Sequence, residues 1–292
     1  MQKIALVTGA TNGIGIWTAL GLAQQGYTVC MVARDRTRGT AMRTWLAERA
    51  PGAQIDLFLA DLSSLAEVRR LADEVKQRYA RLDVLVNNAG LVRDQRELTP
   101  DGFERVVAVN YLTPFLLTLE LLALIRQSVP ARVVNVGSDS SDRAVLDLDN
   151  LQSEKQFSMM GTYSQSKLAI MTFTFELARR LEGSGVTVNV VHPGVVATNI
   201  FDLGGWKGGL VRILMPLIRL FLLTPEQGAR TTLHVATAAE LAAVTGRYFK
   251  NSKEAAHNPI ADDRVLSTAL WERTMALTGA PPASLSAQIE MR

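Results

Sequence analysis

The chain has 292 residues, a formal net charge of +3 and a single cysteine. A chain of this length can bury about 75% of its unfolded surface, so it needs no disulfides. Its mild charge, without a long run of Lys or Arg, argues against a nucleic-acid partner, and no segment reaches the roughly 18 apolar residues of a membrane-spanning helix. Cys30 stands in an apolar run, where we expect a buried and unreactive thiol.

Short apolar runs rich in Val, Ile and Leu alternate with longer amphipathic stretches. The runs predict strands at residues 4–7, 28–32, 54–60, 84–87, 132–136, 186–191 and 246–249. We expect helices to start near Gly13, Asp35, Ser64, Pro100, Phe157, Pro225 and Ala261. This alternation predicts an α/β fold, namely a Rossmann-like, doubly wound parallel sheet of about seven strands with helices on both faces. Residues 1–279 are expected to form a single domain and 280–292 a loose tail.

A glycine-rich segment follows the first predicted strand and opens the first helix. It has the pattern G-x-x-x-G-x-G and consists of Thr8, Gly9, Ala10, Thr11, Asn12, Gly13, Ile14 and Gly15. A dinucleotide site needs a sharp turn, close approach of a pyrophosphate to the backbone and tight packing of the helix. The helix N-terminus would also present free N–H groups to the phosphates. The segment therefore predicts a dinucleotide-binding turn.

The end of the second strand bears on the choice between NADP(H) and NAD(H). Arg34 stands at the strand end, with Arg36 and Arg38 after it. Guanidinium groups suit a 2′-phosphate, so we predict that NADP(H) is preferred, with NAD(H) possible. The alternatives are that the arginines form the solvated start of a helix, or that Asp35 binds the ribose and reverses the preference. Asp61 and Leu62 end the third strand, where they are expected to hold the adenine edge.

A phenol and an ammonium stand four residues apart, in Tyr163-Ser-Gln-Ser-Lys167. On a helix this spacing puts both side chains on one face. A phenol has a free pKa of about 10. A nearby ammonium would lower that pKa and make the phenol a usable general acid and base. A solvated helix face is the alternative for the pair alone.

An apolar segment at 210–223 follows a glycine-rich bend at 204–209. Glycines beside an apolar helix suit a mobile lid, here about residues 199–223, over a lipophilic substrate. A buried core or dimer-facing helix and an interfacial membrane contact are the alternatives. His192, His234 and His257 are scattered and belong to no ligand-spaced cluster, so no metal is expected.

In order and spacing, these motifs resemble the short-chain dehydrogenase/reductase family, in its shorter branch, from Lys3 to about Gly279. The loop at 139–157, the Arg34-Asp35 pair and Leu270-Trp271-Glu272 resemble its retinol-dehydrogenase-like subgroup. The resemblance implies that Tyr163 exchanges the proton at the substrate oxygen and that Lys167 binds the nicotinamide ribose and lowers the Tyr163 pKa. It further implies that Ser138 holds the substrate oxygen and that Asn110 positions a water in a proton relay. Further cofactor contacts implied in the same way are Asn88, Ala89, Gly90, Pro193, Gly194, Val196 and Thr198.

The predicted function is therefore that of an NADP(H)-dependent oxidoreductase interconverting an alcohol and a carbonyl, with a lipophilic substrate. The alternative is a catalytically silent NADP(H)-binding sensor or scaffold, which would have no need of Asn110, Ser138, Tyr163 and Lys167 together. We expect the protein to be cytoplasmic. The resemblance also implies a homodimer or homotetramer, formed through the helices near 101–127 and 157–181.

Overall fold

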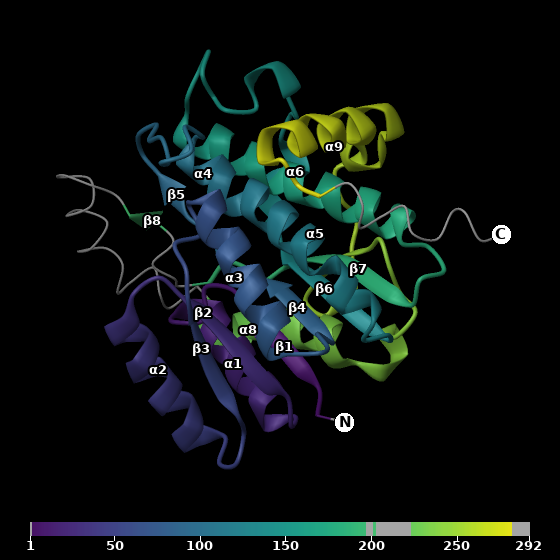
Figure 1. The fold of residues 1–292 in the computed structure, drawn as a ribbon. Coiled ribbons are helices and arrows are strands. Elements are labelled where there is room, and N and C mark those ends of the chain that lie inside the picture. Colours follow the sequence, from purple (N-terminus) through teal and green to yellow (C-terminus); the bar gives the residue numbers. More distant parts are fainter. Residues whose placement is uncertain (1, 197–200, 203–222, 282–292) are drawn as a thin grey trace.

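The computed structural model describes residues 2–196, 201–202 and 223–281 (Figure 1). The predicted tail from residue 282 onward, Thr198 and most of the predicted lid lie outside the described residues. The strands are β1 (Ile4–Val7), β2 (Thr28–Ala33), β3 (Ile55–Leu59), β4 (Val84–Asn87), β5 (Val92–Arg93), β6 (Ala131–Val136), β7 (Val186–His192), β8 (Phe201–Asp202), β9 (Tyr248–Lys250) and β10 (Lys253–Glu254). The α-helices are α1 (Gly13–Gln24), α2 (Arg36–Arg49), α3 (Leu65–Arg78), α4 (Arg105–Val107), α5 (Thr113–Arg126), α6 (Met159–Arg180), α8 (Pro225–Thr237) and α9 (Arg264–Thr278). Shorter turns are the π-helix η1 (Ala108–Leu112) and the 3-10 helices η2 (Asp139–Arg143), η3 (Leu148–Asn150), η5 (Ala239–Leu241) and η6 (Pro259–Asp262).

The main sheet has eight strands in the order β10-β9-β7-β6-β4-β1-β2-β3. Its neighbours pair in parallel, except β9 and β10, which pair antiparallel. The order reverses between β1 and β4, and such a point is where an open α/β sheet binds ligands beyond its strand ends. The predicted doubly wound parallel sheet is confirmed.

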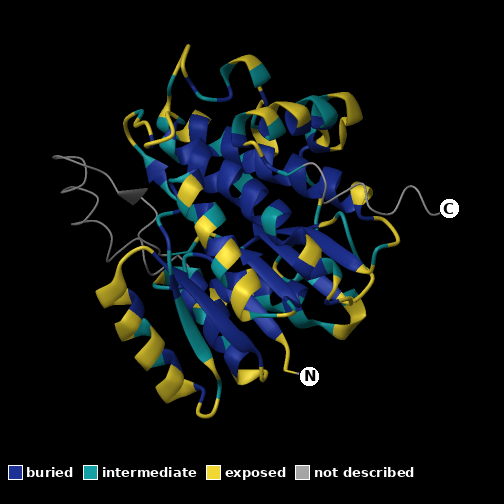
Figure 2. Ribbon diagram, in the orientation of Figure 1, coloured by how far each residue is buried: buried dark blue, intermediate teal, exposed yellow. Residues whose placement is uncertain are grey.

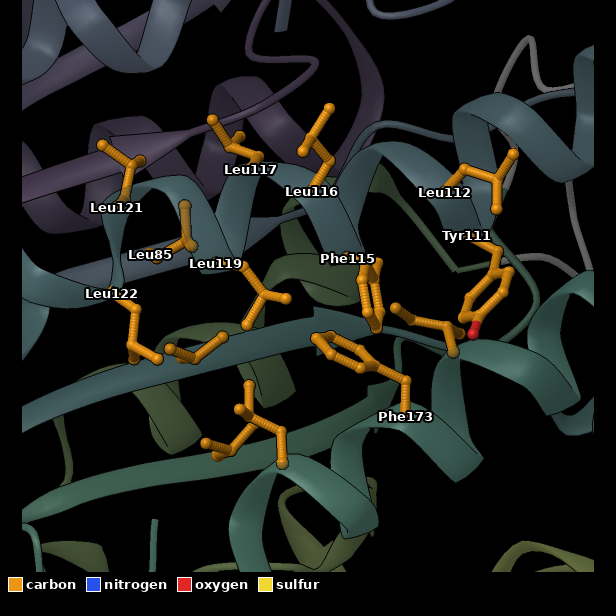
Figure 3. Packing of buried hydrophobic residues seen from close by; sticks show 14 of the residues in the cluster. Leu85, Tyr111, Leu112, Phe115, Leu116, Leu117, Leu119, Leu121, Leu122 and Phe173 are labelled. Carbon is orange, nitrogen blue, oxygen red and sulfur yellow. The ribbon is translucent and has the colours of Figure 1, made fainter. Parts of the chain in front are cut away.

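Both faces of the sheet are buried, which explains why its strands are nearly continuous in apolar residues. Along β1, Leu6 belongs to the hydrophobic cluster under α3, α5 and α6, whereas the adjacent Val7 belongs to the cluster under α1 and α8. The buried colour follows the central strands in Figure 2. Figure 3 shows the larger cluster at close range, where Phe115 of α5 faces Phe173 of α6 with ring centroids 5.0 Å apart.

Most predicted boundaries lie within two residues of those observed, but the helix expected near Pro100 was placed wrongly. It begins at Arg105, because residues 99–103 form a turn and Leu98 pairs with Glu104 in an antiparallel bridge. The buried Glu104 carboxylate then accepts the Val107 N–H at 2.8 Å and caps the helix. The last helix likewise begins at Arg264, after a 3-10 turn at Pro259–Asp262.

The helical stretch Arg105–Arg126 corrects the expectation that no segment suits a membrane span. Among the described residues it is the one helical stretch long and apolar enough to cross a membrane, although 89% of its most apolar part is buried inside the protein. A core helix of a soluble domain passes the same test, so its apolarity is explained by packing.

The C-terminal helix α9 covers the side of α6 that faces away from the sheet (Figure 1). Trp271 of α9 packs against Phe115 and Phe173, with ring centroids 5.0 Å and 5.9 Å away. Tyr111 and Thr274 add a hydrogen bond of 2.6 Å between η1 and α9. This packing explains why α6 is apolar on more than one side.

Candidate active site

A cavity of about 300 Å³ lies at the carboxyl ends of β1, β2, β3 and β4. The predicted cofactor residues that line it are Gly9, Thr11, Asn12, Gly13, Ile14, Arg34, Arg38, Asp61, Leu62, Asn88, Ala89 and Gly90. Segments far apart in the sequence therefore meet in one crevice at the point where the strand order reverses.

The glycines of the turn are required by its geometry. Gly9 and Gly13 have φ of +66° and +51°, in the left-handed region that favours glycine. A Cβ on Gly15 would lie 2.3 Å from Gly9 O and 2.5 Å from Asn88 Nδ2, so Gly15 is needed for tight packing of α1. Glycine at these positions therefore lets the chain turn sharply and α1 pack closely on the turn, two of the demands of a dinucleotide site.

Thr8 ties the glycine turn to the end of β4, a role the sequence analysis did not single out. Its hydroxyl accepts the N–H groups of Asn88 (2.9 Å) and Ala89 (3.0 Å), and Asn88 Nδ2 donates to Thr8 O at 2.8 Å. At the N-terminus of α1, Asn12 makes no side-chain capping bond, in contrast to Asp35 at α2. The first N–H groups of α1 are thus open to an anion.

The two predicted phosphate ligands, Arg34 and Arg38, are exposed and line the cavity. Asp35 also lines it, but its Oδ1 accepts the Arg38 backbone N–H at 2.7 Å and so caps α2. Arg36 does not contribute to the lining. At the end of β3, Asp61 Oδ1 accepts from the Ser63 backbone and hydroxyl, which fixes this part of the wall.

Tyr163 and Lys167 lie on the same side of α6, as their spacing predicts. The helix is capped by Ser158, whose Oγ accepts the Gly161 N–H at 3.1 Å. Lys167 Nζ lies 5.8 Å from the centre of the Tyr163 ring and donates to Val136 O, at the end of β6, at 2.8 Å. Both side chains are buried, and Tyr163 packs in an apolar cluster with Val92 and Val106.

The titration behaviour of this pair differs from the prediction. Burial raises the pKa of Tyr163, and a side-chain hydrogen bond with Ser138 lowers it without cancelling that effect. Lys167 was expected to lower the Tyr163 pKa, but its ammonium is bonded to Val136 O and faces the ring. Burial lowers the pKa of Lys167 itself to about 8. At neutral pH the phenol is therefore protonated, as a proton donor must be.

Ser138 has two roles, of which only one was favoured from the sequence. Its Oγ accepts the Ser140 N–H at 3.2 Å and caps η2. The same hydroxyl lies close enough to Tyr163 to lower the pKa of the phenol. The cap fixes the turn that holds the hydroxyl beside the phenol.

Asn110 lies in the π-helix η1, a kind of turn that often marks functional sites. Its Oδ1 accepts the Leu91 N–H at 2.9 Å, while Nδ2 donates to Leu91 O at 3.0 Å and to Ser166 Oγ at 3.1 Å. A Cβ on Gly90 would lie 3.3 Å from Asn110 Oδ1 and 3.4 Å from Lys167 Nζ, so these groups meet beside Gly90. The side chain holds the backbone after β4, and its oxygen keeps a second lone pair.

The segment after β7 leads away from the same edge of the sheet. Gly194 has φ of +85°, and a Cβ there would lie 2.4 Å from Leu223 Cδ1. Val195 O accepts the Leu223 N–H at 2.9 Å, and Val196 pairs with Leu223. Pro193, Gly194 and Val196 do not line the 300 Å³ cavity.

The loop at 139–157 encloses a second cavity of about 580 Å³ against the start of α6. Most of its lining residues are of polar types, among them Ser140, Arg143 and Ser164. Within the described ranges, no group of three His, Cys, Asp or Glu side chains is placed to hold a metal.

Comparison with known proteins adds independent information. The family model for short chain dehydrogenases matches residues 3–203. Human retinol dehydrogenase 13 is 37% identical over 98% of this chain and 87% of its own length. Human retinol dehydrogenase 14 (40% identical) and human polyprenol dehydrogenase (36%) each cover 95% of this chain and 86% of their own length.

Solved structures agree with these relatives. A structure of Pseudomonas aeruginosa RhlG, described as an active-site complex with NADP, is 30% identical with a TM-score of 0.67, covering 85% of this chain and 93% of that protein. A short chain dehydrogenase from Burkholderia cenocepacia in complex with NADP is 28% identical, also with a TM-score of 0.67, covering 85% and 95%.

Proposed function

The chain belongs to the short-chain dehydrogenase/reductase family, in its retinol-dehydrogenase-like group, and is an NAD(P)-dependent oxidoreductase acting on CH–OH groups; from that premise we propose that it prefers NADP(H) and uses Tyr163 as general acid and base on a lipophilic substrate. The observation that carries the proposal is the placement of Tyr163 beside Ser138 and Lys167, next to a crevice shaped by Gly9 and Gly15.

The crevice fits a dinucleotide because its wall brings the glycine turn and the first turn of α1, which has no side-chain cap, together with the ends of β2, β3 and β4. The residues that would hold the adenosine and phosphates are those of the cavity wall, while Lys167, Pro193, Gly194, Val196 and Thr198 would hold the nicotinamide end. When bound, the nicotinamide supplies the hydride chemistry.

The chain's own residues supply protons and orientation. Ser138 donates a hydrogen bond to the substrate oxygen, where negative charge develops during reduction. Tyr163 gives its proton to that oxygen, and burial keeps the phenol protonated beforehand. Lys167 and Asn110, which meet beside Gly90, form the path by which a proton returns to Tyr163.

The preference for NADP(H) rests on Arg34 and Arg38. Both are exposed in the cavity wall, where their guanidinium groups suit a 2′-phosphate. The ribose-binding alternative for Asp35 is weakened because that carboxylate caps α2 through the Arg38 N–H.

A lipophilic substrate is favoured by the apolar surroundings of Tyr163. Val92, Val106, Leu91 and Met159 pack around the phenol ring. The relatives named for retinol and polyprenol act, by their names, on alcohols with long hydrocarbon chains. The predicted lid, which would close over such a chain, stays part of this proposal.

A silent NADP(H)-binding sensor is the weaker alternative. Lys167 is fully buried, and burying an ammonium opposes folding, which a pure binder has no reason to tolerate. A cytoplasmic location and a homo-oligomer stay predictions. Since α9 covers α6, an assembly through these helices would have to include α9 in its interface.

The test is absorbance at the nicotinamide band, with NADPH or NADH offered against a panel of retinoid, prenyl and small water-soluble aldehydes and ketones. We expect oxidation of NADPH with the long-chain carbonyls. Turnover confined to the small carbonyls would contradict the substrate class, and tenfold better use of NADH would contradict the cofactor preference.

A further inference from the structure

A histidine and two charged side chains join the ends of three neighbouring strands beside Ser138. His192 ends β7, Lys250 ends β9, and Asp139 follows β6 at the start of η2. The Asp139 N–H donates to His192 Nδ1 at 3.2 Å, while His192 Nε2 lies 3.3 Å from Asp139 Oδ2. Lys250 Nζ lies 3.2 Å from the same Oδ2. The His192 ring therefore accepts a hydrogen bond from the Asp139 backbone at Nδ1 and lies close to the Asp139 carboxylate at Nε2.

The hydrogen bond at Nδ1 defines the protonation state of the His192 ring. Nδ1 accepts a backbone N–H and so carries no proton, which leaves the proton on Nε2, facing the Asp139 carboxylate. A doubly protonated ring would direct an N–H at the Asp139 N–H and lose that bond. His192 must be neutral for both contacts to exist, and its 3% exposure keeps water from replacing them.

The clasp formed by Asp139 and His192 sits between two parts of the reaction centre. Asp139 directly follows Ser138, whose hydroxyl bonds with Tyr163. His192 directly precedes Pro193 and Gly194, the segment assigned to the nicotinamide end. A shift of about 1 Å at a reacting group can cost about a hundredfold in rate, so the relative placement of these segments matters.

We propose that His192 is a positioning residue, which holds Ser138 against Tyr163 and in register with Pro193 and Gly194 through its hydrogen bond with the Asp139 backbone and its contact with the Asp139 carboxylate. The proposal rests on the proposed function, because Ser138 and Tyr163 act there on the substrate oxygen. His192 itself touches no reacting atom.

Burial, rather than the charges around the clasp, favours the neutral ring. Burial lowers the pKa of His192 below its usual value, Lys250 lowers it further, and Asp139 opposes both. The further titratable groups around it are Asp142 and Arg143 of η2, Tyr163 of α6, Tyr248 of β9 and His257. The pKa of Asp142 is raised by burial and by Asp139, and that of Tyr248 by burial and both aspartates. His257 is bonded to Asp262 at 2.8 Å.

The first test reads His192 directly and requires no activity. The chain has three histidines, so comparison with His192→Asn identifies the His192 ring signals in an NMR titration. We expect the tautomer with its proton on Nε2 and a midpoint below about 6.5. Lys250→Met should move the midpoint up, and Asp139→Asn, which keeps an acceptor but removes the charge, should move it down. Lys76→Met is the matched control, since Lys76 is exposed on α3, where it pairs with Asp73 and Glu120.

A proton on Nδ1, or a midpoint that neither Lys250→Met nor Asp139→Asn moves, would overturn the clasp. The NMR titration can be carried out even if the protein shows no turnover. A lack of turnover would refute the proposed function, whereas the titration alone would decide whether the clasp exists.

The second test is kinetic. His192→Phe keeps an aromatic ring but removes both ring nitrogens that face Asp139. We expect kcat to fall about tenfold or more, with a smaller change in the KM for NADPH. His192→Asn can still accept the Asp139 N–H and should recover part of the loss. In Lys250→Met the acid limb of the profile of kcat against pH should move to higher pH, because the titration midpoint of His192 does. A folded His192→Phe variant with wild-type kcat, or an acid limb unmoved in Lys250→Met, would refute the positioning role.

Discussion

Replacing Arg34 with alanine tests the source of the predicted NADP(H) preference. Arg34 lies in the cavity wall at the end of β2, while the neighbouring Asp35 carboxylate is engaged with the Arg38 N–H. A hydrogen bond to a charged group contributes about 1.5–3 kcal/mol. Each 1.4 kcal/mol corresponds to about a factor of ten. Since Arg34 is exposed and screened by solvent, we expect the lower end, about a tenfold loss in kcat/KM for NADPH.

The assay is kcat/KM for NADPH and for NADH with one carbonyl substrate, in wild type, Arg34→Ala and Arg36→Ala. Arg36→Ala is the matched control, because it removes the same charge two residues away but lies outside the cavity lining. NADH should be used equally well by all three proteins. An equal loss for both cofactors in Arg34→Ala, or an equal loss of NADPH use in Arg36→Ala, would refute the reasoning.

Three further substitutions test the turn, the core and the buried lysine. Gly15→Ala places a Cβ 2.3 Å from Gly9 O. This variant should lose about 1–3 kcal/mol of stability and bind NADPH more weakly in a fluorescence assay. Gly26→Ala, where the new Cβ is strained but lies in open space, should leave NADPH binding unchanged. Unchanged NADPH affinity in Gly15→Ala would contradict the packing argument. Trp271→Ala empties the contact between α9 and α6 and should lower the free energy of unfolding by about 3–5 kcal/mol in denaturant titrations; a loss below about 1 kcal/mol would mean that α9 is loosely attached. Lys167→Met removes a buried ammonium whose pKa is about 8 in the folded protein, against 10.5 when unfolded. The lowered pKa means that the charged ammonium destabilises the folded state, fully below pH 8 and less and less as the pH rises toward 10.5. The variant should therefore melt above wild type at pH 7, with a gap that narrows above pH 8, and a lower melting temperature at pH 7 would show that Lys167 stabilises the fold.

The strands could be predicted because strands covered on both faces must be apolar at every position, and these runs are bounded by glycines and polar residues. The two-residue β10 carries no such signal, since Lys253 and Glu254 pair only because the chain turns back on β9. The helix start near Pro100 was misplaced because a proline followed by Asp101 is also typical of a turn.

The functional site likewise has parts that the sequence predicts and parts that it does not. The glycine turn and the Tyr163–Lys167 pair are local patterns, and their convergence follows from the parallel topology. The clasp of His192 with Asp139 joins residues that are 53 apart in the sequence, so no local pattern shows it. The raised pKa of Tyr163 was missed for another reason, because spacing says nothing about how deeply a phenol is buried.

Tyr163→Phe is the most direct measurement of the central claim, when NADPH binding and turnover are both recorded. The substitution removes only the hydroxyl that bonds with Ser138 and leaves the ring to pack against Val92 and Val106. We predict that NADPH binds with wild-type affinity while kcat falls by at least a hundredfold, as expected for loss of a general acid. Turnover in Tyr163→Phe within a few fold of wild type would contradict the account.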